Sequence, residues 1–116
     1  MRSDDVLLVD MLIACEKILR FTKDVSKIDF MDNELIQSAV IRELQVIGEV
    51  GRMMCEEGKT QYTDIEWKEI SGMRNRLIHE YFIIRLDIVW QVVIADIPKL
   101  IAAVTTILPS SEDNIL

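Results

Sequence analysis

Glycine, proline, cysteine and histidine are all scarce in this sequence of 116 residues, which has four glycines, two prolines, two cysteines and one histidine. With so few glycines and prolines the chain has few places to turn, which favours a few long elements over many short strands. Cys15 and Cys55 lie forty residues apart, which is not the spacing of metal ligands, and a single histidine adds little to them. We therefore expect no metal site and no cofactor, and we expect both thiols to be buried and free.

Long apolar runs are missing as well. No run approaches the roughly 18 residues that can span a bilayer, and the longest, residues 94–108, is interrupted by Asp96, Pro98 and Lys99. The amino-terminal residues lack the basic start and apolar segment of a secretory signal. These observations predict a cytoplasmic protein without a membrane partner.

Acidic residues outnumber basic ones, and the net charge of −7 argues against indiscriminate nucleic-acid binding. The distribution is uneven, because residues 68–85 hold four basic and two acidic side chains; this segment is +2 and the remainder of the chain is −9. A positive island on a negative body attracts a phosphate, while the body discourages non-specific sliding. Half of the residues are apolar, which is enough for the core of a single domain over residues 1–116, with a frayed tail at 110–116.

Apolar residues recur at spacings of three and four through most of the chain, which is the period of amphipathic helices. We expect a first helix behind a Ser3 cap that ends near residue 21 or 22, and we interpret residues 23–30 as a loop. A second helix over about residues 33–56, capped by Asp32 or Asn33, is expected to end at a left-handed Gly58.

Two glycines lie inside this second helix. Glycine costs about 1 kcal/mol against alanine in a helix interior, so we interpret Gly48 and Gly51 as positions where another helix approaches closely. A third helix, capped by Asp64, is expected to end between residues 79 and 81.

A fourth helix is expected from about Asp87. Near Pro98 the chain either restarts a helix, with Asp96 as the cap, or kinks. Together these segments predict an all-α, up-and-down bundle of four to five helices. The apolar faces exceed what one four-helix core needs, so we expect a homodimer that buries one of them.

Residues 72–82 hold the only histidine, His79, together with Arg74, Asn75, Arg76 and Tyr81. At about 100° per residue, Asn75 and His79 lie opposite the apolar side of the third helix and should face outward. Arg74 lies about 140° from His79 on the same wheel. Its long side chain reaches round, the helix ends before His79, or the two residues converge across a dimer interface; the sequence leaves all three open.

An arginine and a histidine suit the cleavage of a phosphodiester. Arginine offers a fork of donors to two phosphate oxygens and stabilises added charge in the transition state. Histidine titrates near neutral pH and can take or give a proton. Such a pair can cleave RNA without a metal, because the 2′-hydroxyl is an internal nucleophile that DNA lacks, so we expect no DNA substrate. Cleavage often needs two proton-transfer groups, and two protomers would supply two histidines.

The stretch resembles the HEPN superfamily, whose motif is an arginine, four to six residues of which the first is usually polar, and a histidine. Here it consists of Arg74, Asn75 and His79, and Tyr81 completes the Arg-x4-His-x-Tyr form of the HepT-like toxins. The surrounding segments are similar too, namely VIGE at 46–49, WKEISGMRN at 67–75, LDIVW at 86–90 and DIP at 96–98. The resemblance therefore covers essentially the whole chain.

This resemblance implies an all-α homodimer with a metal-independent endoribonuclease site in the cleft between protomers. Arg74 and His79 would be the catalytic pair and Asn75 a polar helper. It also implies a type VII-like toxin–antitoxin pair in which the antitoxin MntA, a minimal nucleotidyltransferase, transfers AMP from ATP onto Tyr81. Glu80 departs from the glycine that is common between the histidine and the tyrosine, and its carboxylate lowers the local positive charge; Arg85, where an acidic residue is frequent, opposes that change.

Two other interpretations remain open at this point. The chain could be a non-catalytic HEPN-like dimer that binds a partner nucleotidyltransferase or a nucleotide, or a purely structural dimer in which Arg74 and His79 form an interface hydrogen bond. Arg76 and Lys68 could contact RNA phosphates or could be solvated surface charges. Trp67 and Trp90 are expected in the core or an interface, because their neighbours in sequence are aliphatic.

Overall fold

The computed structural model describes residues 3–79 and 84–108, and these residues form seven α-helices and one π-helical segment. In chain order they are α1 (Asp4–Phe21), α2 (Lys27–Asp32), α3 (Glu34–Met53), α4 (Glu56–Gln61), α5 (Trp67–His79), α6 (Leu86–Gln91), η2 (Val92–Asp96) and α7 (Ile97–Ile107). The described residues contain no strand, so the predicted all-α class is confirmed. The predicted tail at 110–116 lies outside the described residues.

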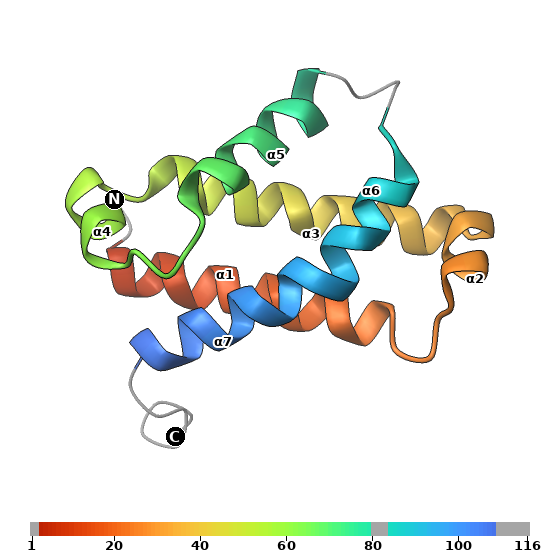
Figure 1. Cartoon of the computed structure of the whole chain (residues 1–116), viewed down its shortest axis with the longest axis horizontal. Coiled ribbons are helices and arrows are strands. Elements are labelled where there is room, and N and C mark those ends of the chain that lie inside the picture. The colour runs from red at the N-terminus through yellow and green to blue at the C-terminus, as the bar shows by residue number, and fades with distance from the viewer. Residues whose placement is uncertain (1–2, 80–83, 109–116) are drawn as a thin grey trace.

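Four long segments build the bundle (Figure 1). Helices α1 and α3 run antiparallel side by side, α5 packs on α3, and the continuous helix α6–η2–α7 crosses the bundle and packs on α1. The core includes large side chains that are almost fully buried from three of these segments, among them Met11, Leu44 and Ile97. The two short helices, α2 and α4, connect α1 to α3 and α3 to α5.

The helix starts follow the predicted caps at two places. The Ser3 hydroxyl accepts a hydrogen bond from the Val6 amide at the start of α1, and the Asn33 side chain accepts one from the Ile36 amide at the start of α3. The predicted Asp64 cap is wrong, because α5 begins at Trp67 and residues 63–65 form a turn. A polar side chain near a helix start is only a candidate cap until the backbone around it is placed.

The interpretation of residues 23–30 as a loop is wrong in its second half. Helix α2 begins there, with the Ser26 hydroxyl accepting a hydrogen bond from the Asp29 amide. Phe30 of this helix is fully buried, with its ring centroid 5.1 Å from that of Trp90 on α6. The Gln37 amide nitrogen then donates to the Phe30 carbonyl at 2.8 Å and so satisfies the end of α2. Trp67 and Trp90 are both buried, as predicted.

The predicted end of the second helix is also wrong. Helix α3 ends at Met53, and Gly58 lies inside α4. Gly58 is not left-handed, since no glycine among the described residues has a positive φ. Cys55 caps α4, because its sulfur accepts a hydrogen bond from the Gly58 amide and its thiol donates to the Asp4 carboxylate on α1. Cys55 is exposed and not buried as expected, whereas Cys15 is buried.

At Pro98 the helix continues through a change of period. Residues 92–96 are π-helical, Asp96 has helical dihedrals and makes no side-chain cap, and α7 follows without a break. Proline lacks an amide proton and its ring collides with the preceding turn. The wider π turn accommodates both effects, so the alternative of a restarted helix is wrong.

The helix across Leu86–Ile107 is the one described helix long and apolar enough to cross a bilayer, with 22 residues and a mean hydropathy of 1.7. The prediction that no segment could span a bilayer is corrected here. That prediction considered only uninterrupted apolar runs, whereas an 18-residue window that contains up to two charged side chains can also be apolar enough. The core helix of a soluble protein passes the same test of length and composition, and 22% of the apolar window is buried in this helix. In this structure its buried residues Trp90, Val93 and Ile97 repeat at helical spacing, while Asp96 and Lys99 are exposed. That is the pattern of a bundle helix with one inner face.

The two thiols should differ in reactivity. Burial, and secondarily the nearby Glu16 carboxylate, raises the pKa of the Cys15 thiol to about 12, so it stays protonated at pH 8. The thiolate is the reactive form. We expect iodoacetamide to label one thiol per native chain, at Cys55, and two per chain in denaturant, as counted by intact mass. Labelling of Cys15 at the rate of Cys55 in the native protein would contradict this placement.

Candidate functional site

Helix α5 lies against α3 at two glycines, which are one helical turn apart. A Cβ atom built on Gly48 would lie 2.7 Å from the Cβ of Arg74, and one on Gly51 would lie 2.7 Å from the Cγ2 of Ile70. Real Cβ atoms essentially never come so close. The predicted role of Gly48 and Gly51 in close helix approach is therefore confirmed. This approach places the Cβ atom of Arg74 directly against α3.

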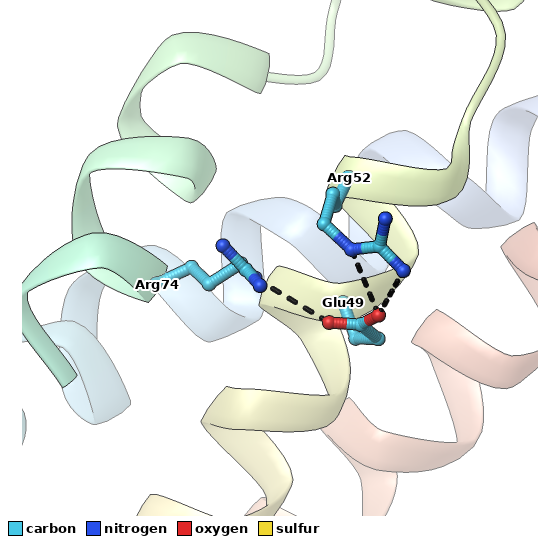
Figure 2. A network of polar contacts seen from close by, with 3 residues as sticks. All are labelled: Glu49, Arg52 and Arg74. Atoms are coloured by element: carbon cyan, nitrogen blue, oxygen red, sulfur yellow. Dashed lines mark hydrogen bonds and ion pairs between the residues drawn. The ribbon is translucent and has the colours of Figure 1, made fainter. Parts of the chain in front are cut away.

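The Arg74 guanidinium forms an ion pair with a carboxylate of α3 (Figure 2). Its Nε donates to Oε2 of Glu49 at 3.4 Å. The other oxygen of Glu49, Oε1, accepts from Nε of Arg52 at 2.9 Å and from its Nη2 at 2.5 Å. These hydrogen bonds, above all those from Arg52, hold the pKa of Glu49 below its ordinary value. The three side chains thus form one network across two helices, and Glu49 is ionised at neutral pH.

Glu49 is the site residue that sequence reasoning missed, because it enters there only as the last residue of the segment VIGE at 46–49. Its position directly after Gly48 is the available signal. A glycine that admits another helix also places its neighbours beside that helix. The contact itself depends on packing between residues that are far apart in sequence, so the sequence alone does not name the partner.

Arg74 and Ile78 line a groove of about 710 Å³ between α5 and the pair α1 and α3. The groove contains apolar side chains of all three helices and charged side chains of both signs. Three of its apolar members are well exposed, namely Ile13 at 46%, Met53 at 41% and Ile78 at 46%. The charged members are Asp10, Lys17, Arg42, Glu43, Glu49 and Arg74.

Lys68 and Arg76 line a different groove on the other side of α5. This second groove, of about 550 Å³, lies between α5 and η2–α7 and has an apolar floor that includes Ile47 and Ile97. Both basic residues are exposed. The structure therefore does not bring Lys68 or Arg76 into the groove that Arg74 lines, although all three lie on one helix.

The remaining motif residues follow the helical wheel as far as they are described. Asn75 is exposed and Leu77 is buried, as predicted. Helix α5 is described as far as His79, and its predicted end between residues 79 and 81 stays a prediction. The side chain of His79 and the whole of Glu80 and Tyr81 lie outside the described residues. Among residues 3–79 and 84–108, no group of three or more histidine, cysteine or acidic side chains is placed to hold a metal ion.

Comparisons with known proteins identify the family of this chain. The model of the family described as Ribonuclease HepT-like matches residues 11–107, which places the chain in the HEPN class. More particularly, the chain belongs to the HepT-like ribonuclease family. The predicted family is thus confirmed.

Several relatives cover nearly the whole chain. A candidate RNase of Methanocaldococcus jannaschii is 37% identical over 99 residues, which are 85% of this chain and 91% of the relative. A candidate RNase of Caldanaerobacter subterraneus subsp. tengcongensis is 34% identical over 108 residues, 93% of this chain and 96% of the relative. A Thermococcus cleftensis protein named as a probable ribonuclease HepT is 37% identical over 99 residues, 85% and 90% of the two chains. No solved structure matches the chain.

Proposed function

We propose that this protein is the ribonuclease toxin of a type VII-like toxin–antitoxin pair and that it cleaves RNA without a metal. The observation that carries the proposal is Arg74, which lies beside a groove on the same helix as His79, in a chain of the HepT-like ribonuclease family. We assign Arg74 and His79 as catalytic residues and Asn75 as a polar helper.

The proposed reaction follows from the chemistry of these side chains. His79 takes the proton of an RNA 2′-hydroxyl, whose oxygen attacks the adjacent phosphorus. The bond from phosphorus to the 5′-oxygen breaks, and a second proton-transfer group protonates that leaving oxygen. The products are a 2′,3′-cyclic phosphate and a free 5′-hydroxyl. Arg74 stabilises the extra negative charge on the phosphorus oxygens during the transfer.

The second proton-transfer group would come from a second copy of the chain. Each chain has one histidine, so one protomer is incomplete for acid–base cleavage that uses two. The exposed apolar residues Ile13, Met53 and Ile78 lie along the groove that also contains Arg74, and they offer a surface for the other protomer. We propose a homodimer in which the two Arg74–His79 pairs meet across this groove.

The experiment that tests the proposed function compares substrates that differ only at the 2′ position. The purified chain is incubated in EDTA with an RNA, with the same RNA carrying one 2′-deoxy nucleotide at the cleaved position, and with the matching DNA. We expect cleavage of the RNA alone, with a cyclic phosphate on the upstream product. Absence of cleavage for every RNA, together with normal growth on expression, would favour the non-catalytic dimer that binds a nucleotidyltransferase or a nucleotide.

We further propose that Tyr81 is the site of inactivation by an MntA-like nucleotidyltransferase antitoxin in the cytoplasm. AMP on this tyrosine, two residues after His79, adds bulk and a negative phosphodiester next to the site, and both effects exclude RNA. After incubation with the antitoxin and ATP, the intact mass should rise in steps of one adenylate. The Tyr81→Phe chain should show no such step, and an unchanged mass for the original chain would count against the modification.

A further inference from the structure

The Glu49 carboxylate is held from one side and faces Arg74 on the other. Oε1 accepts both hydrogen bonds of Arg52, which lies one turn further along α3. Oε2 therefore keeps a defined direction toward α5, where it meets Nε of Arg74. Figure 2 shows the carboxylate between the two guanidinium groups. An anchored carboxylate orients its second partner better than a free one, because less rotamer freedom remains to be lost.

The stem of Arg74 is constrained at the same place. Gly48 brings the backbone of α3 against the Cβ and Cγ atoms of Arg74, so the first part of this side chain has little room to move. Glu49 is the polar partner observed for the Arg74 guanidinium. Its contact uses Nε. The two terminal amino groups, which form the fork that suits phosphate oxygens, take no part in this contact.

We infer that Glu49 is a positioning residue, which holds Arg74 by its Nε and turns its two terminal amino groups toward an RNA phosphate in the groove. The inference rests on the proposed function, since it needs Arg74 in the nuclease site. Arg52 takes part indirectly by fixing the Glu49 carboxylate. None of these roles requires Glu49 or Arg52 to touch the reacting atoms.

The ion pair between Glu49 and Arg74 should weaken the binding of RNA, although it orients Arg74 for catalysis. A carboxylate beside Arg74 lowers the positive potential that attracts a phosphate and repels the phosphate itself. Glu49 therefore improves the geometry of the transition state while it weakens the binding of the substrate. Its replacement by the neutral, nearly isosteric glutamine should lower kcat and leave KM equal or lower. Loss of a merely structural contact would not be expected to lower kcat while leaving KM equal or lower.

The kinetic test compares Glu49→Gln with Glu57→Gln, which makes the same chemical change at an exposed carboxylate on α4. We expect kcat to fall about 10-fold in Glu49→Gln, with no rise in KM, because a misplaced catalytic group costs rate more than binding. Arg52→Gln should show a smaller loss in the same direction, and Glu57→Gln should match the original chain. An unchanged kcat in Glu49→Gln would overturn the inference and leave the proposed function standing.

A second measurement does not depend on activity. In protein labelled with ¹⁵N-arginine, the Nε–H signal of Arg74 is identified by its disappearance in Arg74→Lys, and its order is followed by the heteronuclear NOE. We expect an ordered signal in the original chain and in Glu57→Gln, and a mobile one in Glu49→Gln. Equal order in all three would overturn the inference. If no RNA is cleaved, the proposed function fails, and this measurement still decides whether Glu49 holds Arg74.

Discussion

Replacing His79 with alanine is expected to reduce RNA cleavage by about 10²–10⁴-fold, which is the usual contribution of a positioned acid–base group. The cause is the loss of the only imidazole in the chain, and no other side chain of residues 68–85 has an ordinary pKa near neutral. The measurement is the rate of cleavage of a labelled RNA at saturating enzyme, accompanied by growth of cells that express either chain. Arg74→Lys should also lose most activity, because lysine keeps the charge and loses the fork.

The control for this result is the folding and assembly of the variant. His79→Ala should keep the melting temperature and the oligomeric state of the original chain, since a histidine at a helix end that acts on substrate owes little to packing. A lower melting temperature or a dissociated dimer would support the purely structural interpretation. Equal cleavage and equal growth inhibition by both chains would remove the proposed nuclease altogether.

Gly48→Ala is expected to destabilise the fold by about 1–2 kcal/mol. A methyl group at this position would lie 2.7 Å from the Cβ of Arg74 and 3.4 Å from its Cα, so the backbone of α5 has to move away. Such overpacking costs about 1–3 kcal/mol, and the better helix propensity of alanine returns only part of it. The free energy of unfolding in urea measures the net effect. Because the displaced residue is Arg74, cleavage should fall more than stability alone explains.

Gly72→Ala is the matched control on α5. It makes the same chemical change inside a helix, but a Cβ atom on Gly72 meets no atom within 4 Å. The gain in helix propensity then acts alone, and stability should rise by about 0.5–1 kcal/mol. The two variants should therefore shift the free energy of unfolding in opposite directions. Stabilisation of equal size in both would show that α3 and α5 do not approach closely at Gly48.

The helical class and the course of the long helices could be predicted because their signals are local. The spacing of apolar residues identified α1, α3, α5 and the helix through α6 and α7, and the caps at Ser3 and Asn33 need only a side chain and an amide three residues on. The short helices α2 and α4 were missed for the converse reason. Their caps at Ser26 and Cys55 are local, but Phe30 of α2 packs against Trp90 and Cys55 contacts Asp4, and both of these partners are distant in sequence.

The sequence by itself determined that one helix carries Arg74, Asn75 and His79 and has an apolar stripe on its inner side, because the turn of a helix is the same in every protein. Only the tertiary structure decided what surrounds that helix. Packing of α5 on two glycines of α3 places Glu49 against Arg74, and it turns Lys68 and Arg76 into a different groove. These facts depend on which helices meet and at what distance, and no periodicity within one helix contains that information.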